Sequence, residues 1–333
     1  MSQPVVVPHR SPQARVYLIA AIAAISYGLC ARLFFGWPER PPWVKQMFDV
    51  MSIAFIFVVP AIIGFLAIYL PRVKSLAHAL ALPLLPAIFA LFLTLLLAWE
   101  GLICVAFLLP AVVVLSMLGG LIGWLVVRVQ GDAMRGPTIG AVVLLPLLIS
   151  PLERATPPAD ELRTVATSIA IAADPAIVWR EIASVPEIRS EEHGFAWSHL
   201  IGFPRPIAAT LSGSGVGAVR HATFERGVLF IEEVTVWRED ERLEFTIDAD
   251  PDTIPAEALD EHVTVGGPHF DVLSGAYAIE RLPRGGVVLH LSSVHRLSTT
   301  FNRYAGLWSD FTMRDTQQYI LEIIKRRCEA AAK

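Results

Sequence analysis

The first half of the chain has very few charged residues. Between Val16 and Leu152 the sequence is almost continuously apolar, and the charged residues, 17% of the whole chain, are concentrated after this stretch. About 20 consecutive apolar residues are enough to cross the roughly 30 Å hydrocarbon core of a bilayer. The scarcity of charge therefore excludes a water-soluble domain for this half and predicts a membrane region followed by a soluble one.

Positive charge is also in short supply after the apolar stretch. Residues 1–155 contain ten Lys/Arg and five Asp/Glu, a net charge of +5, whereas residues 156–333 contain 17 and 26, a net charge of −9. Binding to nucleic acid depends on Lys and Arg side chains that neutralise phosphates. The acidic second half therefore argues against a nucleic-acid partner.

Cysteines and catalytic motifs are scarce as well. Two of the three cysteines lie inside apolar runs and the third lies near the C-terminus, so their positions indicate neither a disulfide framework nor a metal site. The histidines of the second half match no standard zinc-ligand spacing. No G-x-S-x-G, P-loop or dinucleotide motif occurs in a supporting context. We expect no metal and no cofactor, and find no support for a hydrolase, kinase or dehydrogenase.

Apolar runs of the first half predict an α-helical transmembrane domain over residues 1–155. The predicted spans are residues 16–35, 47–70, 76–99, 102–127 and 138–152. The last run would be only about 22 Å long as a helix, so four to five spans are expected. The small residues Gly119 and Gly123, four apart, would let two helices approach closely, either inside one molecule or between the copies of a homodimer.

Lys and Arg in the short loops favour a cytoplasmic N-terminus. If the run 138–152 spans, the soluble half lies outside the membrane; if it does not, the soluble half is cytoplasmic. We expect an integral membrane protein, typical of a bacterial inner membrane, with the soluble half on the periplasmic or extracellular side.

Strand-like alternation begins after a linker at residues 156–162. Val165, Thr167, Ile169 and Ile171 alternate with more polar residues, and Asp174-Pro175 is a typical helix start. Further strands are predicted at 206–211, 217–224, 228–237, 243–248, 270–282 and 286–297. A long amphipathic helix follows at about 300–330. The sheet must curl around this helix to bury its apolar stripe.

This order of elements, together with three stretches, resembles the START-like (SRPBCC) superfamily, especially its polyketide cyclase/dehydrase and lipid-transport branch. The stretches are TSIAIAADPAIVW at 167–179, FIEEVTVW at 230–237, and the segment from GAY at 275–277 through FNRYAGLW at 301–308. The resemblance covers about residues 163–330, within a domain expected at 163–333. It implies an α+β helix-grip domain, in which a bent antiparallel sheet surrounds the long C-terminal helix and leaves a cavity for an apolar ligand.

Walls of such a cavity would come from the concave strand faces and the inner face of the last helix. These faces are mainly apolar with a few polar groups, which is typical of a small-molecule pocket and also of an ordinary core. The predicted ligand-lining residues are Tyr277, Leu289, Leu291, Ser293, His295, Tyr304, Trp308 and Phe311.

Two polar pairs are candidates for a special role. His295 and Asp271 would form an acid–base pair if the sheet brings them together. Glu232 or Glu233 must face inward, and a buried carboxylate needs a partner, for which Arg220 on the preceding strand is suitable. The acidic insertion 250–268 is either a lid at the cavity mouth or a solvated loop.

These observations predict a membrane-anchored START-like domain that binds a hydrophobic small molecule or lipid without catalysis. One alternative is an enzyme of the polyketide cyclase or aromatase type that uses His295, Asp271 or Tyr277. Another is an interaction module for a second membrane protein.

Overall fold

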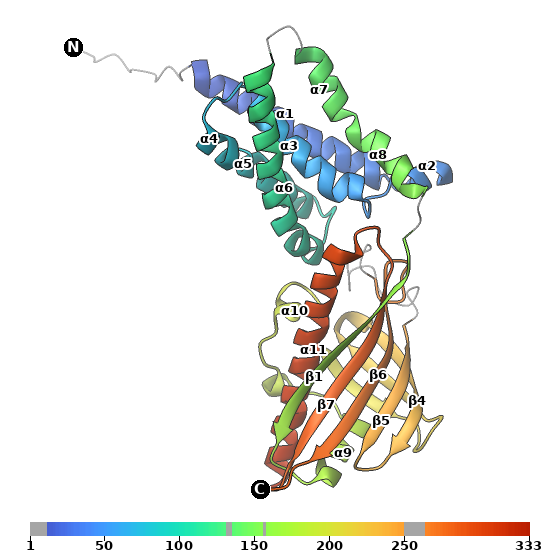
Figure 1. Ribbon diagram of the computed structural model, residues 1–333. Helices are drawn as coiled ribbons and strands as arrows, with labels where there is room; N and C mark the ends of the chain where they lie inside the picture. The colour runs from blue at the N-terminus through green and yellow to red at the C-terminus, as the bar shows by residue number, and fades with distance from the viewer. Residues whose placement is uncertain (1–11, 131–134, 156–157, 250–263) are drawn as a thin grey trace, which may run out of the picture. The chain divides into compact units, whose positions relative to one another are not determined.

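The computed structural model describes residues 12–130, 135–155, 158–249 and 264–333 (Figure 1). The chain forms two compact units. The N-terminal unit comprises residues 1–100 and 105–157, and the C-terminal unit comprises residues 101–104 and 158–333. Each unit is described by itself below.

Helices make up the N-terminal unit. They are α1 (Pro12–Gly36), α2 (Pro42–Met47), the π-helix η1 (Ala54–Val58), α3 (Val59–Tyr69), α4 (Leu76–Ala81), α5 (Leu84–Leu96), α6 (Leu102–Val129), α7 (Arg135–Val143) and α8 (Leu145–Arg154). Among the described residues, four helical stretches are long and apolar enough to cross a membrane: Gln13–Gly36, Leu76–Leu96, Leu102–Val129 and Gly136–Arg154.

The apolar run at 47–70 does not form one helix, which corrects the sequence-based helix bounds. Its apolar helix covers only Ala54–Tyr69. A polar turn precedes it, because the Met51 N–H donates to Asp49 Oδ1 at 2.9 Å and the Phe55 N–H donates to Ser52 Oγ at 3.2 Å. By contrast, the last run, which looked short, belongs to the helical stretch Gly136–Arg154.

Helices α3 and α6 touch backbone to backbone through glycine. A Cβ atom on Gly119 would lie 1.8 Å from the Ala61 carbonyl oxygen, and one on Gly64 would lie 1.9 Å from the Ser116 carbonyl oxygen. Gly123 faces the Phe65 carbonyl oxygen in the same way, with 3.0 Å available. These small residues therefore serve packing inside the unit.

The C-terminal unit is a seven-stranded antiparallel sheet with helices on its concave side. Its strands are β1 (Glu161–Ile171), β2 (Pro206–Leu211), β3 (Val219–Phe224), β4 (Leu229–Arg238), β5 (Arg242–Asp248), β6 (Phe270–Arg281) and β7 (Val287–Leu297). Its helices are α9 (Pro175–Ala183), α10 (Trp197–Leu200) and α11 (Asn302–Ala331), with 3₁₀ turns η3 (Ser190–Glu192) and η4 (Glu225–Gly227).

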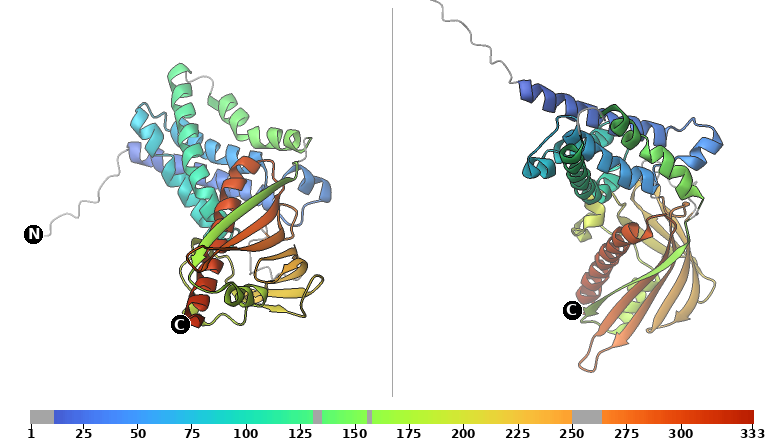
Figure 2. Two further views of the ribbon diagram at one scale, coloured as in Figure 1. Left: turned by 60° about the horizontal axis from the view of Figure 1, so that its bottom comes forward. Right: turned by 45° about the horizontal axis from the view of Figure 1, so that its top comes forward.

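The strand order is β1-β7-β6-β5-β4-β3-β2, so the first strand pairs with the last. Figure 2 shows the sheet bending around α11, which packs mainly against β1 and β7. This arrangement confirms the predicted helix-grip architecture, with a bent antiparallel sheet on a long C-terminal helix.

Local sequence signals account for the turns. Asp174 caps α9, since its side chain accepts a hydrogen bond from the Ala176 N–H at 2.9 Å, and Pro175 occupies the first helical position. The β6–β7 hairpin turns through Gly285 and Gly286, whose φ angles are +93° and +77°. Both glycines therefore adopt a backbone conformation that other residues avoid.

The C-terminal unit has two distinct ends. At the end where the chain enters, which we call the entry end, β1 and α11 both begin, and Asn302 Nδ2 donates to the Ala159 carbonyl at 3.2 Å (Figure 1). At the far end, β1 finishes and the Ala172 N–H donates to Glu329 Oε1 near the end of α11. The main apolar core lies toward the far end and includes Ile171, Val178, Ile182, Leu243, Leu289, Leu321, Ile324 and Cys328.

Candidate functional site

The inner face of β7 changes character along its length. Val287, Leu289, Leu291, Ser293 and His295 alternate with less buried neighbours and all face inward, as the sequence predicted. The first three are apolar and lie toward the far end, whereas Ser293 and His295 lie toward the entry end. Other buried polar side chains accompany them; together they form the inner polar band: Arg220, Glu232, Ser293, His295, Thr312 and Gln317.

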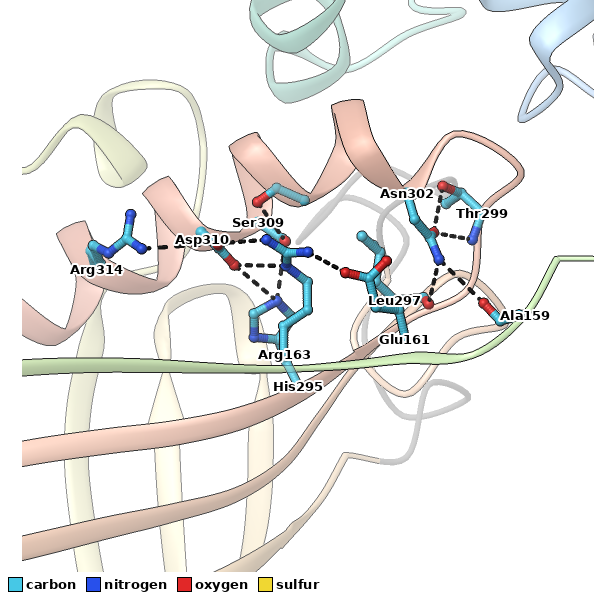
Figure 3. Close-up of polar contacts among 11 residues, drawn as sticks. Ala159, Glu161, Arg163, His295, Leu297, Thr299, Asn302, Ser309, Asp310 and Arg314 are labelled. Atoms are coloured by element: carbon cyan, nitrogen blue, oxygen red, sulfur yellow. Dashed lines mark hydrogen bonds and ion pairs between the residues drawn. The ribbon is translucent and has the colours of Figure 1, made fainter.

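A charged network joins β1, β7 and the start of α11 (Figure 3). Arg163 binds Asp310 through two guanidinium nitrogens, with Nε donating to Oδ1 at 2.9 Å and Nη2 donating to Oδ2 at 2.7 Å. Arg163 also bonds Glu161. This hydrogen-bonding holds the pKa of the Asp310 carboxyl below its usual range. Gly306 makes room for the network, because a Cβ there would lie 2.7 Å from Arg163 Cζ.

His295 lies against this network and is completely buried. Its Nε2 is 3.1 Å from Ser309 Oγ and 3.8 Å from Asp310 Oδ1. Burial lowers the imidazole pKa, and the nearby Asp310 only partly opposes this effect. Its other ring nitrogen, Nδ1, is buried without a hydrogen-bond partner in the part of the chain that the structure describes. His295 is therefore a neutral imidazole with one unused polar atom.

The expected pairing of His295 with Asp271 is not formed. A bulge between Val272 and Ser274 adds a residue to β6 and reverses its alternation there. Val272 consequently stands opposite His295, whereas Asp271 stands opposite Arg296, one residue farther along β7 and on the other face. Burial raises the Asp271 pKa, although Arg296 opposes this effect. The carboxylate beside His295 is that of Asp310.

A second buried charge cluster lies on β3 and β4. Arg220 and Glu232 stand opposite each other and form the ion pair that the sequence predicted, with each side chain nearly fully buried. Tyr277 from β6 interacts with the same guanidinium, which also lies 5.3 Å from the centre of the Phe245 ring. Arg220 Nε is buried without a hydrogen-bond partner among the described residues. Burial raises the pKa of Glu232, and the attraction of Arg220 opposes this effect.

Gln317 connects α11 to the strands from inside. Its Nε2 donates to Ser293 Oγ at 2.9 Å and to the Val165 carbonyl at 3.2 Å, and its Oε1 accepts from Thr167 at 3.0 Å. Gln317, Arg163 and Asp310 are not among the residues predicted from the sequence. A polar residue within the apolar stripe of a helix was the available signal for Gln317.

The remaining predicted lining residues have different surroundings. Tyr277, Leu289 and Leu291 belong to the main apolar core. Tyr304 and Trp308 are partly exposed, with their rings in edge contact. Phe311 is 41% exposed, because it lies on the helix face away from the sheet. A ligand-lining role for these residues stays a prediction.

The buried histidine leads to a prediction about pH. Because its pKa is lower in the folded than in the unfolded protein, the stability it contributes is complete above its ordinary pKa of about 6.5 and is lost as pH falls below that value. We expect the unfolding midpoint of the C-terminal unit to fall as pH decreases from 7 to 5, and His295→Gln to reduce this dependence.

His199, whose pKa is also lowered by burial, accounts for a second share, so the His199→Gln variant and the double variant complete the series. The exposed His290→Gln variant is the control. An unchanged slope in both His295→Gln and the double variant would contradict the prediction. Asp310, with its lowered pKa, affects stability only at more acidic pH, as pH falls below its ordinary value of about 4.

Comparisons with known proteins concern the C-terminal half. No family model matches the chain, and no curated protein matches it. Among solved structures, it is similar to a START superfamily protein from Mycobacterium smegmatis, with 11% identity over 50% of this chain and 98% of the other, at a TM-score of 0.33.

A truncated norcoclaurine synthase from Thalictrum flavum gives 10% identity over 50% of this chain and 95% of the other, at a TM-score of 0.29. The di-domain ARO/CYC protein BexL from the BE-7585A biosynthetic pathway gives 12% identity over 58% of each chain, at a TM-score of 0.33. Identities and TM-scores this low carry no information about function.

Proposed function

We propose that the protein is a membrane-anchored helix-grip domain that binds a hydrophobic small molecule or lipid without catalysis. The observation that carries the proposal is a set of buried polar atoms: Arg220 Nε, His295 Nδ1 and Thr312 Oγ1 have no hydrogen-bond partner among the described residues. Buried polar atoms almost always have a partner in native proteins. A ligand whose polar group enters the inner polar band would provide one.

The surroundings of this band favour a largely apolar ligand. Apolar side chains adjoin it, with Val234, Phe245 and Leu291 in the main core and Phe230 in a second cluster that includes Ala222. Sites for small molecules typically combine apolar walls with a few polar groups that fix orientation. The four long apolar helices found in the described part of the chain support a ligand that partitions into lipid.

The ion pairs that the interior carboxylates make favour binding over catalysis. Glu232 is paired with Arg220, and Asp310 is paired with Arg163. A general acid or base needs a group that can exchange its proton near neutral pH. Arg163 holds Asp310 ionised. The Asp310 carboxylate beside His295 therefore supports recognition better than proton transfer.

Mass spectrometry of molecules that co-purify with the full chain in mild detergent tests this proposal. The informative variant is Arg220→Met/Glu232→Leu, which removes the polar cluster with little change in volume, and the control is Arg242→Met/Glu244→Leu, an exposed pair on the same sheet. We expect a lipid-like molecule in the wild type and the control and its loss from the folded cluster variant.

Lipids bound around the membrane helices are expected in all three proteins. The test therefore compares the amount of each co-purified molecule between the wild type, the cluster variant and the control variant. Equal contents in all three, or a metabolite converted on incubation with the wild type, would overturn the proposal. The first result would favour the interaction-module alternative, and the second would favour a cyclase-type enzyme.

We also propose that the C-terminal unit lies on the periplasmic or extracellular side. The loop charges and the 19-residue helical stretch Gly136–Arg154 support a further crossing before this unit. Reporter fusions after Glu153 test it: alkaline phosphatase activity without green fluorescence is the expected result, and the reverse would place the unit in the cytoplasm.

A further inference from the structure

Exposed apolar side chains of the C-terminal unit gather at its entry end. Of the large apolar residues that are exposed in the described part of residues 158–333, Val216 and Leu282 lie at the far end, in the β2–β3 and β6–β7 connections, and Phe195 lies beside the middle of α11, near Asp315 and Glu322. The others are Leu162, Trp197, Leu200, Ile231, Leu307 and Phe311. We call Trp197, Leu200, Leu307 and Phe311 the entry-end patch.

Helix α10 presents half of the patch. Its Ser198 is buried and its N–H donates to Asp315 Oδ2 of α11 at 2.7 Å, which fixes the short helix against the long one. Trp197 and Leu200, three residues apart, are more than half exposed, and the Phe195 ring packs edge-on against Trp197 at 5.1 Å. Exposed apolar patches of this kind typically mark interaction sites.

The first turns of α11 present the other half. Leu307 and Phe311 are four residues apart and therefore share a helix face. An adjoining face carries Gly306 and Asp310, which contact Arg163 of β1. Leu307 is 67% exposed. The sheet thus covers one face of this segment, and its apolar face points outward.

The connection between the units indicates what covers this surface. Helix α8 ends at Arg154 and β1 begins at Glu161. The six residues between them span at most about 21 Å when fully extended. Only this short connection therefore links the end of a candidate membrane helix to the strand that begins, together with α11, at the entry end.

We propose that the entry-end patch rests on the lipid bilayer surface in which the chain's own N-terminal helices are embedded. Trp and Phe side chains favour the membrane interface, and apolar contact of this kind supplements an anchor. The inference rests on the membrane anchoring in the proposed function. It places the entry end, where the inner polar band begins, against the lipid from which an apolar ligand would come.

Photo-crosslinking in phosphatidylcholine vesicles tests the proposal on the full chain. The photoreactive residue p-benzoylphenylalanine replaces Trp197 or Leu307, and replaces Val216 or Leu282 as exposed apolar controls at the far end. After illumination, mass spectrometry identifies what each position has captured. We expect about tenfold more phospholipid adduct at Trp197 and Leu307 than at either control.

Two results would overturn the inference: equal lipid adducts at all four positions, or crosslinks from Trp197 and Leu307 mainly to protein, whether to the chain's own helices or to a second copy. Retention of the protein in membranes after alkaline carbonate extraction is measured in parallel. Release by carbonate would show that the membrane anchor itself is absent, whereas retention without lipid adducts refutes only the patch. All variants lie at exposed positions, and their unfolding midpoints verify folding.

Discussion

Replacing Arg220 by methionine is expected to lower the unfolding midpoint of the C-terminal unit by on the order of 10 °C. The substitution leaves the Glu232 carboxylate buried without its cation, which typically costs about 3–5 kcal/mol. The midpoint is measured by thermal scanning of the full chain in mild detergent, followed by the circular dichroism of the sheet. The loss is expected to be smaller at low pH, because burial already raises the pKa of Glu232 and favours its neutral form.

Two further variants show whether burial is the cause. Arg220→Met/Glu232→Leu is expected to recover most of the loss, because apolar replacement of a whole buried pair is often close to neutral. Arg242→Met breaks the exposed Arg242–Glu244 pair on the same sheet and is expected to cost at most about 1 kcal/mol. An Arg220→Met variant as stable as Arg242→Met would contradict the buried Arg220–Glu232 ion pair.

Replacing Gly119 by leucine is expected to disrupt the N-terminal unit. The new Cβ would lie 1.8 Å from the Ala61 carbonyl oxygen, which is backbone, so α3 and α6 must separate. Overpacking of this kind costs about 3 kcal/mol or more. The measurement is the fraction of purified protein that elutes as a single species in size-exclusion chromatography, together with its thermal midpoint.

Gly140→Leu is the matched control, since it makes the same substitution in a helix where a Cβ would meet nothing within 4 Å. It is expected to behave like the wild type. Gly64→Leu, on the other side of the α3–α6 contact, is expected to fail as Gly119→Leu does. Normal behaviour of Gly119→Leu would mean that the two helices do not pack through this glycine.

Strands and turns of the C-terminal unit were predictable because their signals are local. The period-two pattern of β7 gave its inward face, and Gly285-Gly286 gave the hairpin. The Arg220–Glu232 pair was also predictable, because a carboxylate on an inner strand face has to be neutralised and the preceding strand carried one arginine at a suitable position.

Long-range features could not be inferred in the same way. Arg163 and Asp310 are 147 residues apart and meet only because the first strand and the last helix share one end of the unit. No local sequence pattern predicts the bulge in β6, yet the one extra residue there turns Asp271 away from His295. In the membrane half, by contrast, Asp49 and Ser52 were a readable turn signal within an apolar run.

Pairing of the first strand with the last has a consequence for how the protein is made. Strand β1 leaves the ribosome before the other strands of the sheet, but its partner β7 and the helix that covers it come last among the elements of this unit. At ordinary translation rates this delay is on the order of ten seconds. During that time the unpaired edges of the growing sheet are open to wrong partners, which is the situation in which chaperones act. A chain truncated before Val287 would lack the strand that joins β1 to the rest of the sheet, so β1 can be paired only after β7 has been made.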